Sequence, residues 1–134
     1  MIIKINPDKE RARAIMKMAL NREQSLGAIK KAGYSTIICE FYYEIIKELM
    51  GAILYLEGKK SVGVNAHKDL IEEISKMNVL PSQEISLVDD LRIKRNGSSY
   101  YGKQIENVYL ENKEFYFKRI ILNLRKYLEG RLNG

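Results

Sequence analysis

Residues 37–57 form the segment that most constrains the fold. Apolar side chains recur here at intervals of three and four residues, which is the period of an α-helix, and the run of about 20 residues is far longer than a typical strand. The apolar residues cover several faces of this helix: Ile38, Phe41, Tyr42, Ile45, Ile46, Leu49, Ile53 and Leu56. A helix that is apolar on several faces is buried among other helices. We therefore predict a central helix that is capped by Ser35 or Thr36 and ended by Gly58.

Proline, glycine and capping residues divide the rest of the chain into further helices. Asn6-Pro7-Asp8 predicts an N-cap at Asn6, and Gly33 predicts that the first helix ends at about Ala32. We expect the other helices at about residues 66–77 after the cap Asn65, 83–99 after Pro81, and 111–128 before Gly130. In the last helix Phe115, Ile120 or Ile121, Leu124 and Leu128 form the predicted inward face.

The connections between these helices are short, and no segment has the pattern of a β-hairpin. Long helices with short connections pack as antiparallel neighbours. We therefore predict one all-α domain over residues 1–134, an up-and-down antiparallel four-helix bundle with an additional short helix.

Composition narrows the classes of function. The 134-residue chain has no run of about 18 apolar residues, so we expect no membrane-spanning helix. A single cysteine, Cys39, suits a reducing compartment, and we expect a cytoplasmic protein in which Cys39 is a small buried apolar residue. No phosphate-binding glycine loop, paired-cysteine site or His-x-x-x-His pair is present, so no cofactor or metal is expected. The one histidine, His67, is expected to serve the start of the short helix.

The net charge of +6 is compatible with a nucleic-acid partner and equally with a solvated basic surface. The charge gathers in residues 92–103, where four basic side chains (Arg92, Lys94, Arg95 and Lys103) stand without an acidic neighbour. The same segment adds hydrogen-bond donors and aromatic faces: Asn96, Ser98, Ser99, Tyr100 and Tyr101. Arginine binds phosphate oxygens in pairs, and tyrosine stacks on bases. A basic helix end that complements the helix dipole fits the same residues.

Helical spacing separates these residues. Arg92, Arg95 and Ser99 share one side of a helix, whereas Tyr100 lies well round the helix from Arg95. Tyr100 or Tyr101 folds back toward Arg95 only if the helix breaks between Gly97 and Gly102, and the two glycines are compatible with such a break.

The chain resembles the HEPN superfamily of small helical domains over nearly its whole length. The resemblance rests on the run Phe41-Tyr42-Tyr43-Glu44, on the turn Gly58-Lys59-Lys60 before His67, and above all on Leu91-Arg92-x-x-Arg95-Asn96-x-x-x-Tyr100. In HEPN domains that cleave RNA, an arginine, a polar residue and a following histidine form a metal-independent ribonuclease site between two protomers.

The resemblance implies that Arg95 holds the scissile phosphate beside Asn96, in a homodimer. Tyr100 occupies the histidine position, and a phenol with an ordinary pKa of about 10 is a poor general base at neutral pH.

Alternative functions remain open at this point. The first is an RNA-interacting protein of a toxin–antitoxin or defence system, with weak metal-independent endoribonuclease activity. The resemblance assigns catalysis to Arg95 and Tyr100, while Arg92, Asn96, Ser99 and Tyr101 bind phosphate or RNA, and it implies a nucleotidyltransferase antitoxin as partner. The second is a non-catalytic HEPN module that binds a nucleotide or a partner protein. The third is a structural helical dimer whose basic segment is only a solvated surface.

Overall fold

The computed structural model describes residues 1–133, apart from the side chains of residues 30–32. This part of the chain folds in the order β1 (Ile2–Lys4), α1 (Lys9–Ala32), α2 (Ser35–Leu56), β2 (Lys59–Ser61), α3 (Ala66–Lys76), α4 (Ser82–Tyr101) and α5 (Asn107–Asn133). The all-α prediction is confirmed, with a small sheet added to it. Within residues 1–133 no helix combines the length and the apolar character that crossing a bilayer requires.

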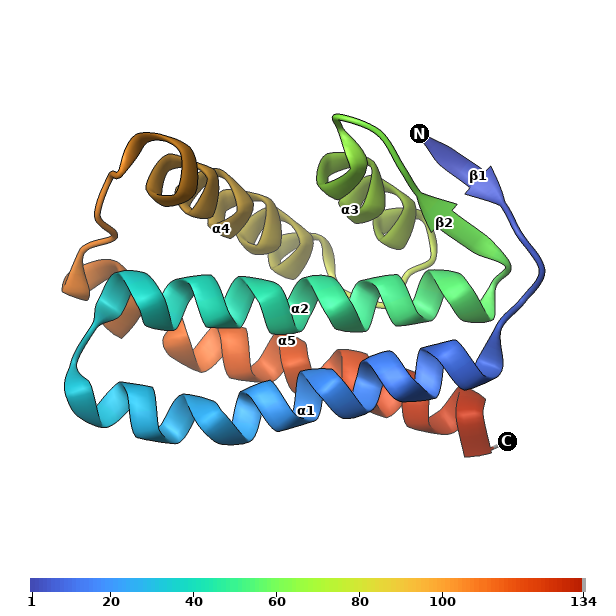
Figure 1. Cartoon of the computed structure of the whole chain (residues 1–134), viewed down its shortest axis with the longest axis horizontal. Helices are drawn as coiled ribbons and strands as arrows, with labels where there is room; N and C mark the ends of the chain where they lie inside the picture. The colour runs from blue at the N-terminus through green and yellow to red at the C-terminus, as the bar shows by residue number, and fades with distance from the viewer. Residues whose placement is uncertain (134) are drawn as a thin grey trace.

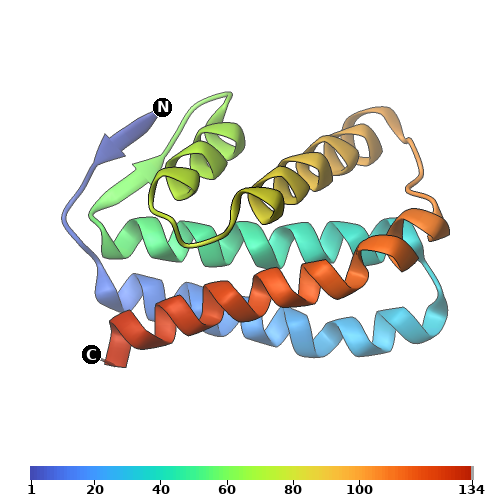
Figure 2. The same ribbon diagram turned by 180° about the vertical axis from the view of Figure 1, so that it is seen from behind.

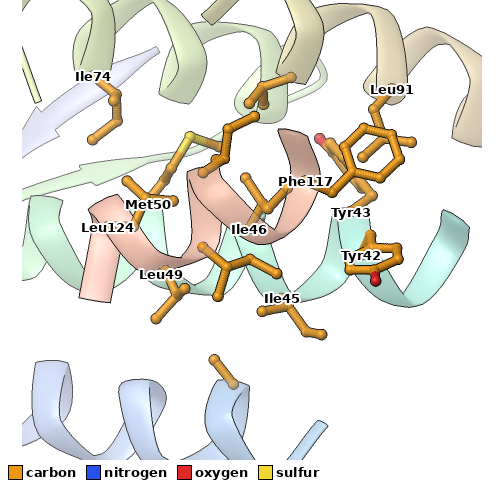
Figure 3. Close-up of a cluster of buried hydrophobic side chains, with 14 of the residues drawn as sticks. Tyr42, Tyr43, Ile45, Ile46, Leu49, Met50, Ile74, Leu91, Phe117 and Leu124 are labelled. Atoms are coloured by element: carbon orange, nitrogen blue, oxygen red, sulfur yellow. The ribbon is translucent and has the colours of Figure 1, made fainter. Parts of the chain in front are cut away.

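Helix α2 lies at the centre, as its apolar faces predict. Helices α1 and α5 lie along one side of it, and α3 and α4 lie on the other (Figures 1 and 2). Side chains of α2 pack against Phe117 and Leu124 of α5, Leu91 of α4 and Ile74 of α3 (Figure 3). Cys39 is buried in this core, as predicted, and burial raises its pKa to about 12 with smaller contributions from Glu114 and Glu40.

The two strands were not predicted. Strands β1 and β2 pair in antiparallel register, with Ile3 opposite Lys60, and α1 and α2 lie between them in the sequence. Three residues are too few to show an alternating pattern, and pairing across two helices leaves no turn signal. Gly58, at φ 71°, permits a close approach here, because a Cβ at this position would lie 2.7 Å from the carbonyl oxygen of Ile5. The sheet therefore ties the first residues to the turn that leads into α3.

Several predicted caps are wrong in detail. Asp8, not Asn6, caps α1, since its carboxylate accepts the backbone N–H of Arg11 at 3.0 Å. Ser35 and Thr36 instead tie the start of α2 to the segment before α5. The Ser35 hydroxyl donates to Asn107, and the Thr36 hydroxyl accepts the N–H of Ile105 at 2.9 Å.

Helix α4 continues through Gly97 to Tyr101, two residues beyond its expected end, so the helix does not break before Gly102. The helix ends where Gly102 takes the left-handed conformation, at φ 65°. Its last turns are held on α2, because the hydroxyls of Ser98 and Ser99 donate to the Glu40 carboxylate at 3.0 and 3.4 Å. Tyr100 and Tyr101 therefore stay on the helix surface, where they are 70% and 77% exposed.

Helix α5 is longer than predicted at both ends and passes through Gly130. Its buried face consists of Leu110, Phe117, Ile120, Ile121, Leu124, Leu128 and Leu132. Phe115 was predicted to point inward, but it is 68% exposed. The reason is helical geometry, since Phe115 lies about 200° around the helix from Phe117.

Candidate phosphate-binding site

A pocket of about 270 Å³ opens between the C-terminal half of α4 and the start of α3, and we call it the α3–α4 pocket. Helix α4 lines it with Arg92, Asn96 and Tyr100, which are spaced four residues apart and so share one side of the helix. The opposite wall is residues 63–68, the connection from β2 and the first turn of α3. Three of the predicted site residues are thus brought together, and no acidic side chain is part of this lining.

Arg92 is held in place from outside the pocket. Its Nε donates to the carboxylate of Asp89, one turn earlier, at 2.8 Å, and its side chain is only 16% exposed. In the described part of the chain the two terminal nitrogens of the guanidinium form no hydrogen bond. Asp89 therefore fixes the orientation of Arg92 and leaves its terminal nitrogens for a ligand, and this paired geometry matches two phosphate oxygens.

Tyr43 of α2 forms a buried support beside the pocket. The guanidinium of Arg95 lies 5.8 Å from the centre of the Tyr43 ring, in a cation–π contact. The ring of His67 lies 5.9 Å from the same centre, tilted by 51°. Arg95 forms no ion pair with any described residue. The structure thus places Arg92 in the pocket lining beside Asn96, and it places Arg95 next to the pocket.

His67 belongs to this site, and sequence reasoning assigned it only to the start of α3. Neither its side chain nor that of Asn65 caps the helix, and across residues 1–133 the ring nitrogens of His67 form no hydrogen bond. Burial lowers the pKa of His67 below its ordinary value, the positive charges of Lys47, Arg95 and Arg92 lower it further, and Glu44 opposes them. His67 is therefore neutral at neutral pH.

The remaining predicted site residues lie elsewhere. Ser99 bonds to Glu40 on the side of α4 that faces α2, and Tyr101 lies 5.9 Å from the ammonium group of Lys103. Neither is part of the lining of the α3–α4 pocket. Ser98 lines a different hollow of about 390 Å³ that includes Glu40. That carboxylate makes the second hollow a poorer place for an anion than the first.

The α3–α4 pocket offers the chemistry of an anion site with one neutral imidazole. Arg92 and Lys68 supply charge, and Asn96 and Tyr100 supply neutral donors, a set that matches the oxygens of a phosphodiester. Among the described residues no three His, Cys, Asp or Glu side chains gather as metal ligands. Comparisons of the chain with protein-family models, with curated proteins and with solved structures found no match.

Proposed function

We propose that this chain is a HEPN-like RNA-interacting protein whose α3–α4 pocket binds the phosphodiester backbone of RNA. The observation that carries the proposal is the meeting of Arg92, Asn96, Tyr100 and Lys68 in one pocket without an acidic side chain. Phosphate contacts dominate the affinity of proteins for nucleic acids, and arginine with neutral donors is the usual set that makes them. The exposed ring of Tyr100 adds a surface on which a base can stack.

The HEPN assignment rests on the sequence resemblance, and the position of the Arg95-Asn96 motif, with Asn96 in the lining of this pocket, supports it. In the HEPN-like bundle that we propose, α1, α2, α4 and α5 are the four up-and-down helices, and α3 is the additional short helix. The same assignment makes weak metal-independent endoribonuclease activity, in a toxin–antitoxin or defence system of the cytoplasm, the expected function. A nucleotidyltransferase antitoxin is the partner that it implies.

Binding is tested by fluorescence anisotropy with a short labelled single-stranded RNA. Two phosphate contacts, from Arg92 and Lys68, correspond to a loss of affinity of about sevenfold between about 50 and 200 mM salt. Replacing Arg92 by alanine removes charge-assisted hydrogen bonds and lowers the affinity about 10- to 100-fold. Lys17→Ala is the matched control, because Lys17 is an exposed cation of α1, on the other side of α2 from the pocket (Figure 1).

The results separate this proposal from the alternatives. Salt-independent binding, or equal losses for Arg92→Ala and Lys17→Ala, contradicts RNA binding in the pocket. Binding of mononucleotides with the same Arg92 dependence, but no binding of RNA, supports the non-catalytic nucleotide-binding module instead.

The expected homodimer has a surface on α5 that suits it. Val108, Phe115 and Leu122 are exposed at intervals of seven residues, and we call them the outer stripe of α5. Antiparallel pairing centred on Phe115 places Val108 opposite Leu122 of the partner subunit and brings Glu111 near Lys118 of the partner subunit. Such a pairing is self-complementary in charge, as a two-fold interface must be.

A charge on the outer stripe tests the dimer. We expect Phe115→Glu to convert the protein to a monomer in light-scattering measurements of molar mass, because it buries two carboxylates side by side at the two-fold axis. Met18→Glu, which changes an exposed apolar residue on α1 (51% exposed, against 68% for Phe115), is expected to leave the molar mass unchanged. A wild-type monomer, or a dimer that survives Phe115→Glu, contradicts this interface.

A further inference from the structure

We propose that His67, contributed by α3, is the proton-accepting catalytic group of the α3–α4 pocket. This inference rests on the proposed function, because it supplies the base for RNA cleavage that residues 92–103 lack. In those residues Tyr100 stands where a histidine is expected, and the chain has no other histidine than His67. The folded chain nevertheless brings an imidazole to the same pocket from a different helix.

The first argument is position. His67 on one wall and Arg92, Asn96 and Tyr100 on the other line a single pocket, so a phosphodiester bound by Arg92 lies beside the imidazole. The ring of Tyr43 is fully buried, and it contacts both the His67 ring and the Arg95 guanidinium. This contact supports the His67 ring on its buried side and so limits its movement in the pocket, which a catalytic base requires.

The second argument is charge. The charged groups that act on the pKa of His67 are Lys47 and Glu44 from α2 and Arg92 and Arg95 from α4, and Lys68 follows it on α3. Glu44 is paired with Lys47 at 2.9 Å and Asp89 with Arg92 at 2.8 Å, so Arg95 and Lys68 leave the net charge around the imidazole positive. A positive surrounding keeps the imidazole neutral and able to accept a proton, and it also attracts the phosphate. No carboxylate lies within hydrogen-bond distance of His67 in residues 1–133.

The reaction that follows is internal transfer at phosphorus. Neutral His67 accepts the proton of a ribose 2′-hydroxyl, and the 2′-oxygen forms a bond to the adjacent phosphorus. The bond from phosphorus to the 5′-oxygen of the next nucleotide breaks, and that oxygen takes a proton from water. Arg92 and the Tyr100 hydroxyl bind the non-bridging oxygens on which charge accumulates. The products are a 2′,3′-cyclic phosphate and a 5′-hydroxyl, and the imidazolium then returns its proton to water.

The test is cleavage of a short labelled RNA in excess EDTA, under single-turnover conditions, by the wild-type chain and by His67→Ala and His67→Gln. We expect both variants to lower the rate about 10²- to 10⁴-fold while RNA affinity changes by less than about threefold. The glutamine variant keeps a side chain of similar size on Tyr43, and circular dichroism establishes that each variant is folded. RNA with 2′-deoxyribose at every position is expected to bind and to resist cleavage.

The pH profile separates a catalytic from a packing role. The wild-type rate is expected to fall below about pH 6.5 as His67 gains its proton, and the residual rate of His67→Gln is expected to lack this acid limb. Cleavage by His67→Gln at the wild-type rate overturns the proposal. Binding without any cleavage by the wild-type chain also overturns it and leaves RNA binding intact. Absence of binding refutes the proposed function itself.

Discussion

Two adjacent tyrosines in the core are expected to respond in opposite ways to the loss of their hydroxyls. Tyr42 and Tyr43 are both fully buried, and they leave α2 in different directions (Figure 3). The Tyr42 hydroxyl donates to the carboxylate of Glu114 at 2.7 Å. The Tyr43 hydroxyl has no hydrogen-bond partner within the described residues. Burial raises the pKa of Tyr43 to about 12, although the charges of Arg92 and Arg95 oppose this rise. At neutral pH the core therefore contains a neutral Tyr43 hydroxyl without a hydrogen-bond partner.

The magnitudes follow from these contacts. A buried hydroxyl without a partner costs about 1–3 kcal/mol, and Tyr43→Phe removes it with little change in shape, so we expect the free energy of unfolding to rise by about 1 kcal/mol. Hydrogen bonds to a charged group contribute about 1.5–3 kcal/mol, and Glu114 is half-buried, so we expect Tyr42→Phe to lower the free energy of unfolding by about 1.5 kcal/mol. The two variants are therefore expected to differ by about 2.5 kcal/mol, which is about 10 °C in Tm.

Urea unfolding followed by circular dichroism at the helical band measures both values. Tyr43→Phe keeps the ring that supports His67 and Arg95, so RNA affinity is expected to stay at the wild-type level. If Tyr43→Phe destabilises the chain as much as Tyr42→Phe does, then the Tyr43 hydroxyl has a partner and the description of the pocket's support is wrong.

Two further predictions concern the turn after α2 and the histidine. Gly58→Ala is expected to destabilise the chain by about 2–3 kcal/mol, because it combines a positive φ with a Cβ 2.7 Å from the Ile5 oxygen. Gly33 also has a positive φ but open space around it, so Gly33→Ala is expected to cost about 1 kcal/mol in the same urea assay. The pKa of His67 lies below 6.5 in the folded chain, so between that pKa and 6.5 the unfolded chain binds more protons. Stability is therefore expected to fall as the pH drops below 6.5, and less steeply in His67→Gln; equal slopes for the two chains contradict the lowered pKa.

The ends of the helices were predictable where a local signal marks them. Gly33 and Gly58 adopt the positive φ that ends α1 and α2, and Pro81 stands directly before α4, as predicted. Local sequence signals do not show where a tertiary contact determines the end of a helix. The glycines made a break between Gly97 and Gly102 compatible with the sequence, yet α4 continues to Tyr101, and Ser98 and Ser99 bond to Glu40 of α2.

The candidate site was likewise predictable from the sequence only in part. The basic character of residues 92–103 is visible in the sequence, and the four-residue spacing of Arg92, Asn96 and Tyr100 places them on one side of α4. Which side of α4 faces a pocket depends on the burial of Val88 and Leu91 against the core. His67 lies in the pocket because α3 packs beside α4. The sequence pattern of the segment that joins these helices does not show how they pack. The sequence pattern therefore indicated the arginines, whereas only the packing of the helices showed that His67 lies in the same pocket.

The single histidine makes the central claim directly measurable. In two-dimensional NMR of the imidazole, the single histidine gives one unambiguous set of signals, and the pKa of His67 is obtained by titration with and without a short 2′-deoxy oligonucleotide. The proposed mechanism predicts that this oligonucleotide binds and is not cleaved. We predict that the bound phosphate raises the pKa of His67 and shifts its signals, and that Arg92→Ala abolishes both changes. Signals and a pKa of His67 that stay unchanged while the oligonucleotide binds would show that nucleic acid binds elsewhere on the chain.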